Sequence, residues 1–227
     1  MNTKPNTRTA DEERPDTREM VIIHRGLRRE ARLLVELIAA VPPGDTARAT
    51  VLAGHFRDYR LGLHNHHHGE DLHLWPALLA KVDLEADAVL RMDIQHERIA
   101  QTLTAAEATL PAWESTGGEQ ERDALVAALS EHRAALVEHL DEEERVLLPL
   151  VARHLTQREW KAMGDHFLES TPKPKLLLFL GIVLEDADQA ERAAVLAGLP
   201  LPARLVWHAV GRPLYRRRTR LVRASRA

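Results

Sequence analysis

Two segments of the chain carry the same metal-binding side chains in the same order. Residues 66–76 read HHHGEDLHLWP and residues 139–149 read HLDEEERVLLP, so both fit H-x-x-x-E-[DE]-x-x-L-[LW]-P with a period of 73 residues. A histidine and a glutamate four positions apart share one face of a helix. Imidazole and carboxylate together suit iron, and less specifically manganese or zinc. Each segment therefore predicts a pair of metal ligands on one helix.

A single histidine precedes each segment at a similar distance. His24 lies 42 residues before His66, and His96 lies 43 residues before His139. Both fall in the apolar stripe of an expected helix, and burying imidazoles and carboxylates in a leucine-rich core is costly unless they are paired or bound to metal. Two copies related by a pseudo-twofold axis favour two metal ions. We predict six ligands, with the two glutamates as bridges: His24, His66, Glu70, His96, His139 and Glu143.

The number of ligands leaves room for small molecules. Four imidazoles and two bridging carboxylates offer about eight contacts, whereas two six-coordinate ions need about twelve. Water, an oxo or hydroxo bridge and open positions would supply the remainder. We therefore expect two iron ions as the cofactor, and oxygen, hydrogen peroxide or nitric oxide as the partner.

Four long amphipathic helices are expected to position these residues. They are predicted over 18–41, 46 to about 80, 83–110 and about 119–154, with Asp45 as an N-cap and a kink near Pro76. Pro42-Pro43-Gly44 and the segment from Pro111 to Gly118 should separate them. Long helices with short connections predict an all-α, up-down-up-down four-helix bundle, here over residues 16–155.

With these motifs the chain resembles the hemerythrin-like, or HHE cation-binding, family. That family has a four-helix bundle around a non-haem di-iron centre, and its ligand motif matches the six residues named above. The resemblance covers roughly residues 16–155. It implies a protein that binds or senses oxygen or handles iron; the alternative is a redox enzyme acting on hydrogen peroxide or nitric oxide at the same site.

One position departs from the family's oxygen carriers. They have a second histidine one turn after the histidine of the third helix, and this chain has Ala100 there. The departure argues against simple reversible oxygen carriage. Tyr59 and His132 each precede a paired ligand by seven residues and should face inward. Either is expected to be an additional metal ligand or to support one through a hydrogen bond.

The neighbours of the predicted ligands are given other roles. His67 and His68 are expected at the flank of the bundle or in solvent. Asp71 and Glu144 directly follow the predicted bridges, and a shift of one residue would exchange their roles. The remaining histidines considered are interpreted as surface or structural residues: His55, His64, His154, His166 and His208.

Residues 156–227 are expected to form a helical extension that begins with a capping box at Thr156 and Glu159. From Arg192 onward there are nine arginines and no acidic residue, so this basic tail carries +9 against −12 for residues 1–191. We expect it to pack on the acidic body of its own chain or of a partner subunit, in preference to an anionic membrane. It shows no nucleic-acid-binding motif.

From its composition we expect the protein to be cytoplasmic. The sequence has no cysteine, which excludes disulfides, thiolate metal sites and cysteine nucleophiles. Residues 1–16 are polar, and the longest apolar run, 176–184, is too short to span a bilayer.

Overall fold

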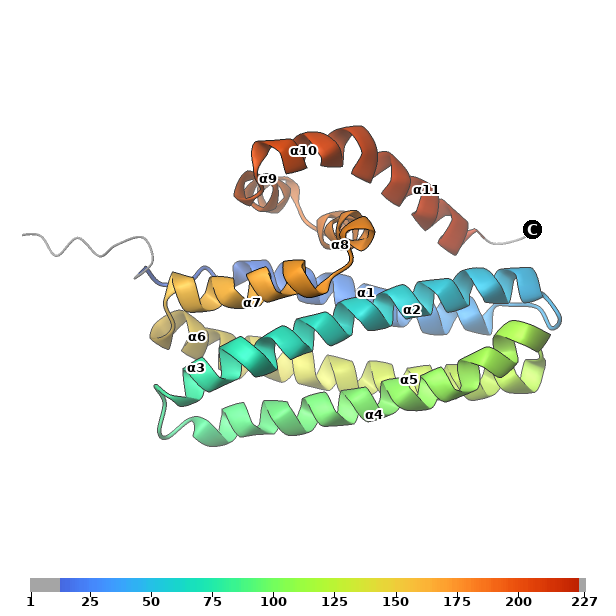
Figure 1. Cartoon of the computed structure of the whole chain (residues 1–227). Coiled ribbons are helices and arrows are strands. Elements are labelled where there is room, and N and C mark those ends of the chain that lie inside the picture. The colour runs from blue at the N-terminus through green and yellow to red at the C-terminus, as the bar shows by residue number, and fades with distance from the viewer. Residues whose placement is uncertain (1–12, 225–227) are drawn as a thin grey trace, which may run out of the picture.

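A computed structural model describes residues 13–224, and its regular elements are all helical. Four long helices lie side by side, and successive ones run in opposite directions (Figure 1). These four helices are α1 (Arg18–Ala39), α2 (Thr46–Gly69), α4 (Ala86–Thr116) and α5 (Glu119–Glu142). The predicted all-α class is confirmed.

Three wide π-helical turns interrupt the helices, and the sequence predicted only a kink near one of them. These turns are η2 (Glu70–Leu74), η3 (Glu143–Leu147) and η4 (Trp207–Gly211). Each begins six residues before a proline: Pro76, Pro149 and Pro213. Proline lacks an N–H, and its ring collides with the carbonyl four residues back in a regular helix. The wider turn accommodates this ring.

Short helices continue beyond the first two π turns. α3 (Trp75–Leu79) extends α2, and α6 (Leu148–His154) extends α5. In each case the first backbone N–H after the turn donates to the carbonyl of the glutamate that opens it, Glu70 or Glu143. Both copies of the sequence motif therefore place their glutamate at the same point of the same irregular turn.

The helix boundaries follow from local signals in most places. Asp45 caps α2 by accepting a hydrogen bond from the backbone N–H of Arg48 at 2.9 Å. The third helix was expected to stop at Pro111, and this was wrong, since α4 continues to Thr116. Pro111 removes one hydrogen bond, but Leu110 and Trp113 beside it are buried and hold the helix in place. Gly117, with φ of 60°, then ends it.

The bundle core consists of two apolar clusters with a polar layer between them. One cluster contains Leu27, Leu63 and Ile99, and the other contains Met20 and Leu74. The histidines and glutamates of the sequence motifs fall between members of the two clusters along each helix. Polar groups in the middle of a core need partners, so this layer is the candidate functional site.

The C-terminal region is a set of shorter helices on one side of the bundle (Figure 1). They are α7 (Gln157–Ser170), α8 (Lys173–Glu185), α9 (Gln189–Gly198), α10 (Leu201–Val206) and α11 (Arg212–Arg223). The capping box of α7 is present, with Thr156 and Glu159 bonded to each other's backbone N–H. α7 packs on α2 and η2, α8 packs on α1, and α11 packs on α8 and α2.

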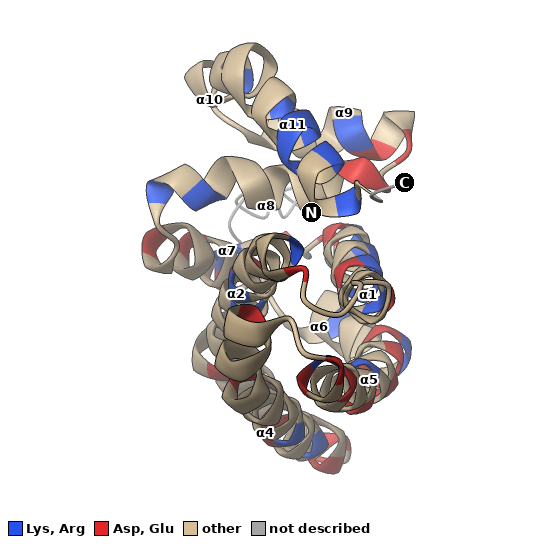
Figure 2. Ribbon diagram, turned by 90° about the vertical axis from the view of Figure 1, so that its right-hand side faces the viewer, with Lys and Arg blue, Asp and Glu red and all other residues tan. Residues whose placement is uncertain are grey.

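Ion pairs join this region to the bundle. Asp58 of α2 pairs with Lys175 of α8 and Arg218 of α11. Arg29 of α1 pairs with Asp186 at 2.5 Å, and Val222 of α11 is buried as part of the bundle's core. Figure 2 shows several basic positions along α11, while the bundle helices carry both acidic and basic positions. Between residues 13 and 224 no helix is both long and apolar enough to cross a membrane.

Candidate metal centre

The structure brings all six predicted ligands together, and all six are buried. Glu70 lies between two imidazoles, with 3.3 Å to His66 Nε2 and 3.5 Å to His96 Nε2. Glu143 lies between the other two, with 3.3 Å to His24 Nε2 and 3.6 Å to His139 Nε2. Each glutamate thus faces the histidine of its own helix and the single histidine of another.

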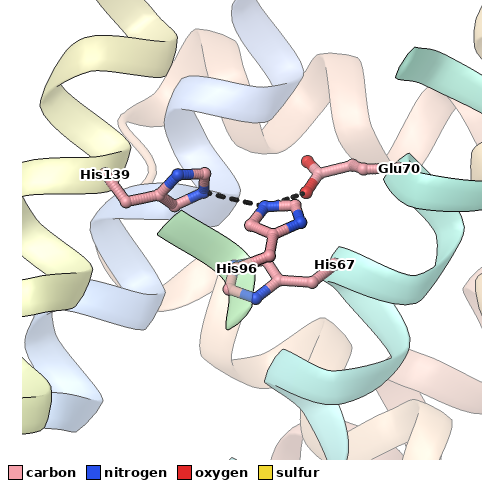
Figure 3. A group of neighbouring side chains, drawn as sticks. All are labelled: His67, Glu70, His96 and His139. Atoms are coloured by element: carbon pink, nitrogen blue, oxygen red, sulfur yellow. Dashed lines mark hydrogen bonds and ion pairs between the residues drawn. The ribbon is translucent and has the colours of Figure 1, made fainter. Parts of the chain in front are cut away.

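Two groups of potential ligand atoms can be defined by proximity, since the atoms of each group lie within 4.8 Å of one another. His24, His66 and Glu70 form the first group. The second group consists of His67, Glu70, His96 and His139, and Figure 3 shows these four side chains converging from three helices. Glu70 belongs to both groups. Glu143 belongs to neither group, although it is close to His24 and His139.

His67 lies inside the bundle, so the expectation that it lies at the flank or in solvent was wrong. It is 7% exposed, and its ring stacks on that of His96 with 4.0 Å between centroids. Two consecutive residues of α2 reach the interior because they face different helices, His66 towards His24 of α1 and His67 towards His96 of α4. His68, the next residue, is exposed as expected.

The outer nitrogens of three imidazoles are held by hydrogen bonds. His24 Nδ1 donates to Glu144 at 2.9 Å, and His96 Nδ1 donates to Asp71 at 2.7 Å. Glu144 and Asp71 thus orient the two histidines from the outer side. The carboxylates that face the interior are Glu70 and Glu143. The proton on Nδ1 leaves Nε2 of each ring with a lone pair that points inward.

His139 is held in the same way by an amide. Gln95 donates its side-chain N–H to Glu142 at 2.7 Å, so its carbonyl oxygen faces His139 Nδ1 at 3.1 Å and accepts a hydrogen bond from it. His139 Nε2 then carries a lone pair, and it lies 3.2 Å from His96 Nε2, which carries another. Two lone pairs at this distance repel each other, and a cation between the rings would relieve that repulsion.

Many other inward-facing atoms of the centre have no hydrogen-bond partner among the described residues. They are Nε2 of His24, His66 and His67 and both carboxylate oxygens of Glu70 and of Glu143. Leaving a buried polar atom unpaired costs about 1–3 kcal/mol, and more when it is charged. The unpaired atoms are imidazole nitrogens and carboxylate oxygens, so this donor set fits bound transition-metal ions.

Burial also determines the protonation of the centre. It raises the pKa of Glu70 well above its usual value, and the neighbouring carboxylates of Glu143 and Asp71 raise it further. Burial raises the pKa of Glu143 as well. The pKa values of His66, His67 and His139 are lowered well below the usual value, first by burial and then by the neighbouring imidazoles. Neutral imidazoles present the lone pairs that metal ions require.

Tyr59 and His132 are bonded to each other. Tyr59 Oη lies 2.6 Å from His132 Nε2, and Thr102 Oγ1 lies 3.1 Å from His132 Nδ1. Both residues are buried, and neither belongs to the two groups of potential ligands. Burial raises the pKa of Tyr59 well above its usual value, which disfavours the phenolate form.

A groove of about 590 Å³ lies between α2 and α4 and reaches the centre from outside. Its lining includes two potential ligands and their neighbours: His67, His96, His64, His68, Asp71 and Ala100. Because residue 100 is alanine, no side chain fills the space one turn after His96. A small molecule could approach His67 and His96 by this route.

The fold and site define a cation-binding four-helix bundle, and comparison with known proteins agrees. The model of the hemerythrin HHE cation-binding domain matches residues 16–151, and the chain belongs to this family. No curated protein and no solved structure matches the chain.

Proposed function

We propose that this chain is a non-haem di-iron protein that binds or senses oxygen, or handles iron, through the buried centre. The observation that carries the proposal is the pair of facing Nε2 atoms of His96 and His139, 3.2 Å apart, together with the unpaired oxygens of Glu70 and Glu143. Metal ions would satisfy these nitrogen and oxygen atoms best.

The two groups of potential ligands suggest how two ions would be held. His24 and His66 would bind one ion, and His67, His96 and His139 would bind the other. Glu70 would bridge both ions, and Glu143 would contribute from the side of His24 and His139. Iron bound in this way supplies one-electron redox chemistry and open coordination positions.

His67 bears on the choice between binding and catalysis. The family's oxygen carriers place a second histidine after the histidine of the third helix, and this chain replaces it with Ala100. His67 provides an imidazole on the same side of the centre, stacked on His96. His67 of α2 thus supplies the imidazole that is missing at position 100 of α4. This supports oxygen binding or sensing as the first candidate.

A redox enzyme acting on hydrogen peroxide or nitric oxide is the second candidate. The groove beside His67, His96 and Ala100 favours it, since it gives a small substrate direct access to the centre. Asp71 also lines this groove and accepts the hydrogen bond from His96 Nδ1. A molecule that binds in the groove and moves Asp71 would therefore also move His96.

Anaerobic reconstitution with Fe²⁺ separates the two candidates. Absorption spectra are recorded after oxygen, hydrogen peroxide or nitric oxide is added to separate samples. A change caused by oxygen that reverses when oxygen is removed supports binding, whereas rapid turnover of peroxide or nitric oxide supports the enzyme. Failure to take up iron under these conditions contradicts both.

A further inference from the structure

A second set of histidines lies where α7 packs on α2 and η2, outside the two groups of potential ligands of the buried centre. We define the outer histidine cluster as His68 of α2, His73 of η2 and His166 of α7. His68 is exposed, and His73 and His166 are half-buried. The sequence interpretation treated His166 as surface or structural, and the proposed di-iron function uses none of the three.

His166 lies at the distance of a shared ion from each of the other two rings. The ring of His166 lies 5.1 Å from that of His68 and 5.3 Å from that of His73, measured between centroids. Two imidazoles bound at about 2.0–2.1 Å to one tetrahedral ion have centroids roughly 5 Å apart. The exposed ring of His68 also stacks on that of His64, with 5.7 Å between centroids, and would turn from this contact towards a shared ion.

His166 occupies the middle of the cluster with an unused nitrogen. Its Nε2 atom is buried and has no hydrogen-bond partner among the described residues. Burial and the neighbouring rings of His68 and His73 lower the pKa of His166, which keeps its lone pair available near neutral pH.

The local backbone explains how three segments bring these rings together. Residues five apart in a regular α-helix point about 140° away from each other. The π turn η2 is closed by the five-residue hydrogen bond from the N–H of Trp75 to the carbonyl of Glu70, and this wider turn changes the direction of His73, whose ring, like that of His68, lies beside His166. Gly69 lies between His68 and His73 in the sequence, and a Cβ there would lie 3.2 Å from Met163 Cγ and 3.5 Å from His166 Cδ2. Glycine therefore lets α7 approach closely enough for His166 to join the cluster.

We propose that His68, His73 and His166 form a second metal site, at the surface, that binds one divalent transition-metal ion such as Zn²⁺, Co²⁺ or Ni²⁺. Three imidazoles without a bridging carboxylate select these ions over Mg²⁺ or Ca²⁺, which prefer oxygen ligands. Water completes the coordination because the site is open to solvent. This site differs from the buried centre in ligand set, exposure and number of ions.

The test titrates Zn²⁺ into the full-length, iron-loaded protein, while zinc and iron are counted separately. The wild type is expected to bind one zinc ion without losing iron, and zinc-edge X-ray absorption should show three imidazoles. His166→Gln and His73→Gln should each weaken zinc binding by at least tenfold and leave iron content unchanged. His208→Gln, at an exposed histidine of the tail, is the matched control and should bind zinc as the wild type does.

Three results would overturn the proposal. One is zinc binding with unchanged affinity in both His166→Gln and His73→Gln. Another is an equal loss in His208→Gln, which would indicate nonspecific binding to histidines. The third is zinc that enters only by displacing iron, which would assign it to the buried centre. Because iron is counted in the same samples, failure of the di-iron function and failure of the outer site can be distinguished.

Discussion

The Nδ1 atom of His24 donates a hydrogen bond of 2.9 Å to Glu144, and this contact has a counterpart in the other half of the bundle. There His96 Nδ1 donates to Asp71 at 2.7 Å. In both halves, the residue after the interior glutamate holds the single histidine of another helix. The internal repeat therefore encodes both the inward-facing glutamate and the support for a histidine.

This support gives the first prediction. Asp71→Ala and Glu144→Ala should each lower metal affinity by about 10–100-fold, because the imidazole loses its fixed tautomer and orientation. Competition with a chromophoric chelator measures the affinity. Glu138→Ala is the control, since Glu138 is exposed and its recorded pair is with Arg98. Affinity equal to that of the wild type in both variants would mean that these carboxylates do not orient ligands.

The second prediction concerns the bridging glutamates. Glu70→Gln and Glu143→Gln should each lose at least one iron ion while circular dichroism shows an intact helical bundle. In the absence of metal each variant should melt no lower than the metal-free wild type, because the substitution removes a buried ionisable group. The rise in Tm on metal binding should shrink. If both variants keep two irons, neither glutamate is required to hold the metal ions.

His67 provides the third prediction. His67→Ala should lose the ion held with His96 and His139, or weaken its binding by at least tenfold, because one of three imidazoles is removed. His64→Ala, three residues earlier and exposed, should retain the metal content of the wild type. Metal analysis after dialysis against a chelator compares them. Full retention of both ions in His67→Ala would return this residue to a packing role.

Tyr59 provides the fourth prediction. In Tyr59→Phe the absorption of the iron-loaded protein should not change, because the hydroxyl is bonded to His132. The free energy of unfolding should fall by about 1–3 kcal/mol, since His132 Nε2 is left buried without its partner. Spectra and urea denaturation are recorded on the same samples. Disappearance of a visible band in this variant would instead identify Tyr59 as a metal ligand.

The sequence was sufficient for the fold and for the six residues that meet in the centre. Repetition of H-x-x-x-E and of single histidines in apolar stripes carries this information, because helical periodicity determines which residues share a face. Periodicity also explains what was missed. It assumes a regular helix, so it could not foresee the π turns that begin at Glu70 and Glu143, nor the approach of His68 and His73 to His166.

His67 shows a second limit of sequence interpretation. A single helix projected onto a wheel has one inward face, and His66 occupied it. In the bundle α2 contacts both α1 and α4, so its inward arc is wide enough for two consecutive residues. Pro111 likewise predicted a helix end, but the helix continues because Leu110 and Trp113 beside it are buried. Both outcomes depend on packing between elements, which one sequence does not display.

Metal analysis of the anaerobically purified protein tests the central claim most directly. The protein is produced in iron-supplied cells with the substitution His166→Gln, so that the outer histidine cluster contributes no metal. We expect two iron ions per chain, and fewer than two when Glu70 is also replaced by Gln. One tightly bound zinc ion per chain, with no uptake of iron on reconstitution, would contradict the central claim.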